Sequence, residues 1–201
     1  MIDSTIEELI QIARPQSIYQ IYDLHRDGDR VMISGTSFQL KGDSIASHLS
    51  KSDKCCLLAV TLGVEADRKI HSYQVKEMTR AVILDACASA GVENICQGIQ
   101  AEVKALVAKE GQYITNRFSP GYGDFPIEAQ GELLNLLKGY QRIGLTATAR
   151  HLLIPRKSVT AMIGIGPTSM EQDYLPCDGC LARIHCKYRK GGISCGIFRS
   201  V

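Results

Sequence analysis

Tryptophan is absent from this chain of 201 residues, and no stretch approaches the length of an apolar membrane-spanning helix. Such a helix needs roughly 18 uninterrupted apolar residues. The first residues, MIDSTIEELIQIARPQ, are polar and acidic, so they lack the basic start and the apolar core of a secretory signal. A formal net charge of +2 gives no sign of a nucleic-acid-binding surface. These absences predict a cytoplasmic protein that binds neither membranes nor nucleic acids.

The composition that remains is typical of a globular protein. Hydrophobic residues make up 45% of the chain and charged residues 22%. The length suffices for one substantial core, with or without a small appendage.

Cysteine is abundant, with eight residues placed unevenly along the chain. Cys55 and Cys56 lie in the apolar run CCLLAV, and Cys87 and Cys96 lie in a helical pattern. Because a free cysteine behaves as a small apolar residue, we expect these four to pack in the core.

The other four cysteines crowd together near the C-terminus, in the pattern Cys177-x2-Cys180-x5-Cys186-x8-Cys195. A reducing compartment disfavours structural disulfides, so ligation of a metal by four thiolates is the better interpretation. Four thiolates suit either an iron–sulfur cluster or Zn²⁺, and the spacing matches neither a zinc ribbon nor a ferredoxin run. Unliganded or redox-active thiols are the third alternative. The preceding Gly166-Pro167 pair predicts a body of residues 1–166 and a Cys-rich segment of residues 167–201.

Hydrophobic periodicity and breaker residues predict helices and strands over the body. We expect helices at residues 3–13, 64–73, 74–109 and 127–137, and a short one through Leu49 that Asp43 or Ser44 could cap. Strands are expected at residues 17–23, 30–34, 54–62 and 159–165. The long helix would measure about 50 Å if unbroken, at 1.5 Å per residue. These elements predict an α+β fold with a twisted, mainly antiparallel sheet and long helices.

The stretch RFSPGYGDFP, which starts at Arg117, is the most informative local pattern. Pro120-Gly121 predicts a turn, because proline presets φ and glycine admits conformations closed to other residues. A guanidinium (Arg117), a phenol (Tyr122) and a carboxylate (Asp124) flank the turn, and Asp124 is expected to cap the helix that begins near Pro126. These groups on a stiff turn suit the binding of a small molecule. A surface loop with an incidental arginine and tyrosine is the ordinary alternative.

One face of the long predicted helix carries a carboxylate among small side chains. Ala86, Ser89, Ala90, Glu93 and Cys96 fall together at helical spacings. The space beside Glu93 could accept a ligand or a close-packed neighbour. A solvated glutamate at the margin of a buried stripe is the alternative.

These residues carry a likeness to a known family. The block RFSPGYGDFP, followed by the segment RIGLTATARHLLIPRKSVTAMIGI, resembles the reactivation domain of cobalamin-dependent methionine synthase. The later segment holds a threonine near its middle, Thr146 or Thr148, and the Ser158-Val159 pair that introduces a strand. The likeness covers roughly residues 55–166.

The resemblance implies a site for S-adenosylmethionine. It assigns ligand contacts to Glu93, Arg117, Ser119, Pro120, Gly121 and Tyr122. Arg117 would hold the carboxylate, because its guanidinium binds such groups through two parallel bonds. Glu93 would accept from the ammonium group or the ribose hydroxyls, and backbone groups at the turn would reach the adenine or ribose. Tyr122 would occupy the catalytic position, where the methyl group meets the corrinoid.

Two features of this implied site stay open at the level of the sequence. Phe118 and Ser119 stand where the family usually has proline and alanine, which could alter the pocket wall. The family also uses an acidic contact from the N-terminal part, for which Asp23 and Asp43 are both candidates.

The implied function is the repair of oxidised cobalamin. One electron and a methyl group from S-adenosylmethionine would restore methylcobalamin on a separate corrinoid protein such as methionine synthase, with the corrinoid supplying the reactivity. A flavodoxin or ferredoxin would supply the electron, and an iron–sulfur cluster in the tail could relay it. The chain would act as a stand-alone relative, because it lacks the zinc, folate and corrinoid modules. Alternatives are a non-catalytic interaction or regulatory module and an activator of another corrinoid methyltransferase.

Overall fold

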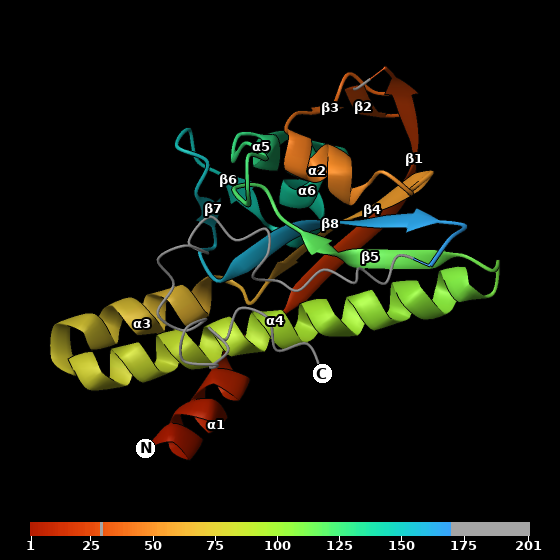
Figure 1. Ribbon diagram of the computed structural model, residues 1–201. Helices are drawn as coiled ribbons and strands as arrows, with labels where there is room; N and C mark the ends of the chain where they lie inside the picture. The colour runs from red at the N-terminus through yellow and green to blue at the C-terminus, as the bar shows by residue number, and fades with distance from the viewer. Residues whose placement is uncertain (29, 170–201) are drawn as a thin grey trace, which may run out of the picture. The chain divides into compact units, whose positions relative to one another are not determined.

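The computed structural model describes residues 1–28 and 30–169 (Figure 1). The chain divides into a unit Met1–Ser169 and a second unit Met170–Val201, and the second unit lies outside the described residues. The predicted metal ligands in the Cys-rich tail therefore lie outside them as well.

An antiparallel sheet of six strands forms the centre of the first unit, in the order β3-β2-β1-β4-β8-β5. Its strands are β1 (Gln16–Asp27), β2 (Arg30–Ile33), β3 (Gln39–Leu40), β4 (Lys54–Thr61), β5 (Tyr113–Phe118) and β8 (Ser158–Gly166). A separate two-stranded ribbon pairs β6 (Thr146–Ala147) with β7 (Leu153–Ile154).

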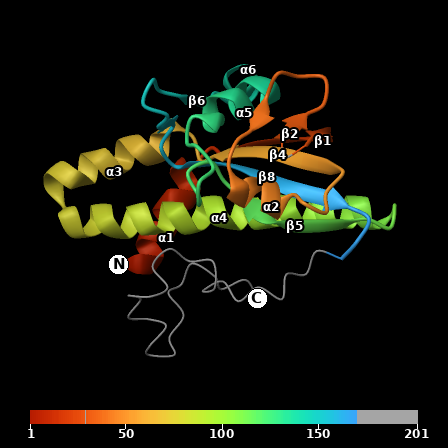
Figure 2. The same cartoon turned by 45° about the horizontal axis from the view of Figure 1, so that its top comes forward.

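Helices cover both faces of the sheet (Figures 1 and 2). They are α1 (Ile2–Ile12), α2 (Asp43–His48), α3 (Val64–Lys76), α4 (Met78–Ala108), α5 (Ala129–Leu137) and α6 (Gly139–Ile143). The long helix α4 runs beside the sheet together with α1 and α3, and α2, α5 and α6 lie on the other side. The predicted α+β fold class is confirmed.

The burial of both faces of strand β4 explains why its sequence is a continuous apolar run. Cys56, Leu58 and Val60 pack in the core with α1, α3 and α4. The alternate residues of the same strand, which include Cys55 and Leu57, pack in the core with α2 and α5. Successive strand side chains point to opposite faces, so a strand covered on both sides needs apolar residues at every position.

The structure also corrects several boundaries. The predicted helices 64–73 and 74–109 meet at Glu77, whose φ of −147° and ψ of 77° break the helical geometry between α3 and α4. With 31 residues, α4 measures about 46 Å at 1.5 Å per residue. Strand β5, which carries Arg117, and the short elements β3, α6, β6 and β7 were not predicted.

Candidate functional site

Strand β5 contains a bulge that sets the direction of Arg117. Ile114 pairs with Ile165 and Arg117 pairs with Ile163, so between these two pairs β5 has one residue more than β8. An extra residue shifts the in–out alternation by one position. Ile114 packs in the core on the α4 side, and Arg117 also reaches α4. Without the bulge, these two side chains would face opposite sides of the sheet.

The Arg117 side chain is held by two residues of α4. Its Nη2 donates to Oε2 of Glu93 at 2.9 Å, and its Nε donates to Oε1 of Gln100 at 3.1 Å. Glu93 and Gln100 are seven residues apart, which places them on one helix face. The Arg117 side chain is 19% exposed, whereas that of Glu93 is 51% exposed. The pair thus presents a guanidinium partly shielded from water beside a carboxylate open to it.

Cys96 lies under this pair, on the same face of α4. Its side chain is fully buried, and burial raises the pKa of its thiol to about 11, although the nearby charge of Arg117 acts in the opposite direction. The thiol is therefore neutral at physiological pH and forms a small apolar floor beneath Arg117.

Phe118 points to the opposite face, as the alternation after the bulge requires. Its ring lies 4.9 Å from that of His48 at the end of α2, 6.4 Å from that of Tyr122 and 6.3 Å from that of Phe125, between ring centroids. Burial lowers the pKa of His48, while its hydrogen bond to the Asn116 carbonyl, 2.9 Å from Nε2, raises it. A neutral His48 that donates from Nε2 satisfies both observations.

The Pro120-Gly121 turn is closed by its own backbone. Gly121 has φ +91°, and its N–H donates to the carbonyl of Phe125 at 2.8 Å. The N–H of Tyr122 donates to the carbonyl of Ser119 at 3.2 Å. Only glycine adopts such a φ readily, so the predicted turn follows from this residue. A ligand could reach the carbonyl of Gly121 without opening the turn, but not its N–H.

Asp124 has a role different from the predicted one. Its carboxylate accepts from the N–H of Ser44 at 2.9 Å and from that of Asp43 at 2.7 Å, at the start of α2. These bonds lower the pKa of Asp124, and the bond from Ser44 has the largest effect. The prediction that Asp124 caps the helix after Pro126 is wrong, because α5 begins at Ala129 and its N-cap is Glu128.

Two glycines make the contact between this loop and α2 close. A Cβ on Gly42 would lie 2.8 Å from both the carbonyl oxygen and Oδ1 of Asp124, and one on Gly123 would lie 2.6 Å from Oγ of Ser44. Both have positive φ, +117° for Gly42 and +56° for Gly123. Glycine at these positions therefore lets the loop dock directly on the N-terminus of α2.

The predicted ligand residues fall on α4, the end of β5 and the loop that follows β5. Glu93 and Arg117 are in direct contact, Ser119 is half-buried and Pro120 is buried. Tyr122 is 59% exposed. The small residues Ala86, Ser89 and Ala90 of the predicted helix face are exposed as well, which agrees with Glu93 at the margin of a buried stripe.

The acidic candidates differ in position. Asp43 begins α2 and donates its N–H to Asp124, so it adjoins the loop. Asp23 lies on β1 opposite Lys54. The structure thus favours Asp43 as the acidic residue nearer to the site.

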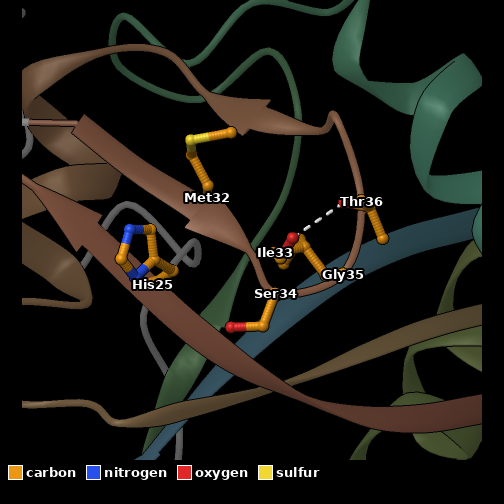
Figure 3. A pocket seen from close by; sticks show the side chains of 6 residues that line it. All are labelled: His25, Met32, Ile33, Ser34, Gly35 and Thr36. Carbon is orange, nitrogen blue, oxygen red and sulfur yellow. Dashed lines mark hydrogen bonds between the residues drawn. The ribbon is translucent and has the colours of Figure 1, made fainter.

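An open hollow of about 300 Å³ lies elsewhere, at the β1–β2 hairpin (Figure 3). It is lined by His25, Met32, Ile33, Ser34, Gly35 and Thr36. The hydroxyl of Thr36 donates to the carbonyl of Ile33 at 2.8 Å, which closes the turn at its rim. None of the predicted ligand residues lines this hollow, so we assign the candidate site to the end of β5 and the loop after it.

The comparison with protein families decides the relationship. The family model described as "Vitamin B12 dependent methionine synthase, activation domain" matches residues 4–177. The chain belongs to this family. The match includes β5, the loop after it and α4, so the activation-domain family accounts for the part of the chain that carries the candidate site.

A solved structure supports the same fold for this activation domain. It is described as "Crystal Structure of the MetH Reactivation Domain bound to AdoHcy", and the match has a TM-score of 0.66 and 16% sequence identity. It covers 96% of this chain and 71% of that chain. No curated protein matches the chain in sequence.

The described residues offer neither a membrane-spanning helix nor a metal-binding cluster. Over residues 1–28 and 30–169, no helix is long and apolar enough to cross a membrane. The same residues hold no cluster of three or more histidine, cysteine or acidic side chains that could bind a metal ion. Metal ligation by Cys177, Cys180, Cys186 and Cys195 stays a prediction.

Sequence reasoning overlooked Gln100, His48 and the docking of Asp124 on α2. Gln100 could have been found from its spacing, because it is two helical turns after Glu93. The other two contacts left no signal, since they join residues about 70 to 80 positions apart through backbone groups.

Proposed function

We propose that this protein binds S-adenosylmethionine and supports reductive methylation of the cobalamin carried by a separate corrinoid protein such as methionine synthase. The observation that carries the proposal is the Arg117–Glu93 pair beside the glycine turn. The family relationship supports the reaction, and the AdoHcy named for the similar structure supports the ligand.

The geometry suits the amino-acid end of such a ligand. The ligand carries a carboxylate and an ammonium group on neighbouring positions, and Arg117 and Glu93 offer the complementary charges 2.9 Å apart. Arginine can bind the carboxylate through two parallel N–H bonds. Glu93, half-exposed, has carboxylate lone pairs left to accept from the ammonium group. The neutral floor formed by Cys96 adds no competing charge.

Calorimetric titration with S-adenosylmethionine and S-adenosylhomocysteine tests the proposal. Arg117→Ala should weaken binding by roughly tenfold to a hundredfold, because it removes a charge-assisted hydrogen-bonding group. Arg117→Lys should weaken it less but clearly, since lysine cannot bind bidentately. The matched control is Arg68→Ala, which removes an exposed arginine that pairs with Glu65 on α3. No binding to the wild-type protein at millimolar ligand would favour the non-catalytic interaction module.

Tyr122 is proposed to lie where the methyl group meets the corrinoid. Its exposure of 59% leaves the ring accessible to a partner protein. Tyr122→Ala should therefore slow methyl transfer more than it weakens ligand binding. An equal effect on both would assign Tyr122 to ligand binding alone.

The proposed reaction has two steps, and the cobalamin supplies the reactive centre. A flavodoxin or ferredoxin gives one electron to cob(II)alamin, and the resulting cob(I)alamin takes the methyl group from the sulfonium, which leaves S-adenosylhomocysteine. No proton is transferred, so the protein's part is positioning. Mixing this chain with a candidate corrinoid protein, reductant and ligand should produce the spectrum of methylcobalamin. A second corrinoid methyltransferase that is methylated faster would identify a different partner.

The four tail cysteines are proposed to hold an iron–sulfur cluster or zinc, with free thiols as the alternative. Iron, sulfide and zinc analysis after anaerobic purification distinguishes these cases. A colourless, iron-free protein would exclude electron relay by the tail.

A further inference from the structure

Gln100 is the second partner of the Arg117 guanidinium. Its Oε1 accepts from Nε at 3.1 Å, while Glu93 accepts from Nη2 at 2.9 Å. In the planar guanidinium, Nε–H and one Nη2–H point along the same edge. Helix α4 therefore holds one edge of Arg117 with one charged and one neutral acceptor. Within residues 1–28 and 30–169, no oxygen acceptor bonds to the opposite edge, formed by Nη1 and the second Nη2–H, although the Cys96 side chain also contacts Arg117. We take this opposite edge as the one that a ligand would use.

We propose that Gln100 is a positioning residue for carboxylate binding by Arg117, and that its neutral amide is required. The proposal rests on the function proposed above, because it concerns the same ligand. Holding Nε fixes the plane of the guanidinium and hence the direction of its outer edge. A neutral acceptor does this without offsetting a second unit of charge, so Arg117 keeps its attraction for an incoming carboxylate.

Two substitutions of Gln100 separate the effect of its charge from the effect of its hydrogen bond. Gln100→Glu keeps the length of the side chain and an acceptor for Nε, so it changes mainly the charge. Two carboxylates on one guanidinium would then repel a third. Gln100→Met keeps the approximate length and removes the acceptor, so it changes mainly the positioning.

The matched control is Gln74→Glu, an exposed glutamine on α3 that undergoes the same change of charge. Gln74 lies near the junction of α3 and α4, and Met78, the first residue of α4, is fifteen positions before Glu93, or about 22 Å along the helix. This distance exceeds the screening length of about 8 Å at physiological ionic strength. Any effect of Gln74→Glu on ligand binding should therefore be small.

Calorimetric titration with S-adenosylhomocysteine and with 5′-methylthioadenosine provides the test, since the second compound keeps the adenosine and thioether but lacks the carboxylate. Gln100→Glu should bind S-adenosylhomocysteine about tenfold more weakly or worse, because like charges meet at the site. Its affinity for 5′-methylthioadenosine should stay within about twofold, as should both affinities of Gln74→Glu. Gln100→Met should lose severalfold for S-adenosylhomocysteine alone.

Two results would overturn the proposal. The first is unchanged affinity of Gln100→Glu for S-adenosylhomocysteine, and the second is an equal loss for both compounds, which would indicate general damage to the site. If the wild-type protein binds neither compound, the proposed function fails, but the hydrogen bond by which Gln100 positions Arg117 can still be measured. The Nε–H proton of Arg117, observed by NMR, should exchange faster in Gln100→Met than in Gln74→Glu, and equal exchange would refute the contact.

Discussion

Gly42→Ala should disturb the candidate site from outside it. Gly42 precedes α2 with φ +117° and ψ 141°, a conformation that is almost restricted to glycine. A Cβ there would lie 2.8 Å from the carbonyl oxygen of Asp124, which is backbone and cannot rotate away. The new methyl group must therefore push the loop away from α2.

The expected cost has two parts. A residue forced into such a backbone region costs about 1–3 kcal/mol. Overpacking against a fixed neighbour costs about 1–3 kcal/mol more. Gly35→Ala is the control, because Gly35 has φ +73° but nothing within 4 Å of its added Cβ. That substitution should cost only the positive-φ penalty of about 1–2 kcal/mol.

Urea unfolding of the two variants measures this difference. Gly42→Ala should be less stable than Gly35→Ala by about 2 kcal/mol, with unchanged dependence on urea. It should also bind S-adenosylhomocysteine more weakly than Gly35→Ala, because the displaced loop carries Ser119 to Tyr122. Equal stability of the two alanine variants would falsify the inference that the loop docks rigidly on α2.

Three further predictions concern pH, thiol reactivity and packing. Burial lowers the pKa of His48 below its usual value of 6.5. The stabilisation by neutral His48 is therefore complete above pH 6.5 and is lost as the pH falls through its folded pKa. In urea titrations, the wild-type protein should lose more free energy of unfolding between pH 7 and 5 than His48→Gln. In native protein, mass mapping after maleimide treatment should find Cys87 modified before Cys56 and Cys96, whose buried thiols have a pKa raised to about 12 and about 11; equal labelling of all three would contradict their burial. Gly164→Ala should cost about 1–3 kcal/mol in thermal unfolding, since its Cβ would collide with the side chain of Ser52 and meet those of Leu49 and Thr115 at 2.9 and 3.0 Å; a neutral effect would mean that the segment after α2 shifts freely.

The sequence predicted those parts of the fold that depend on long periodic patterns. The apolar run of β4 and the stripe of α4 are such patterns, and both elements lie within a few residues of their predicted bounds. The break between the two predicted helices was placed a few residues too early, because neither glycine nor proline marks its position at Glu77. Elements of two residues, such as β6, are too short for periodicity to detect. The direct contact of Glu93 with Arg117 was not predicted, because the family resemblance implied only that both residues contact one ligand.

The residues of the candidate site contact helices on both faces of the sheet, and the bulge in β5 is the reason. After the bulge, Arg117 faces α4 while the next residue, Phe118, faces α2. The loop then continues to Asp124, which binds the N-terminus of α2, and to Phe125, which is buried in the core on that side. One stretch of nine residues is thus fixed to a helix on each face of the sheet. A ligand held by Arg117 and the glycine turn would therefore be positioned by the sheet and by the helices on both of its faces. Such a rigid support suits a protein whose proposed part in the reaction is positioning alone.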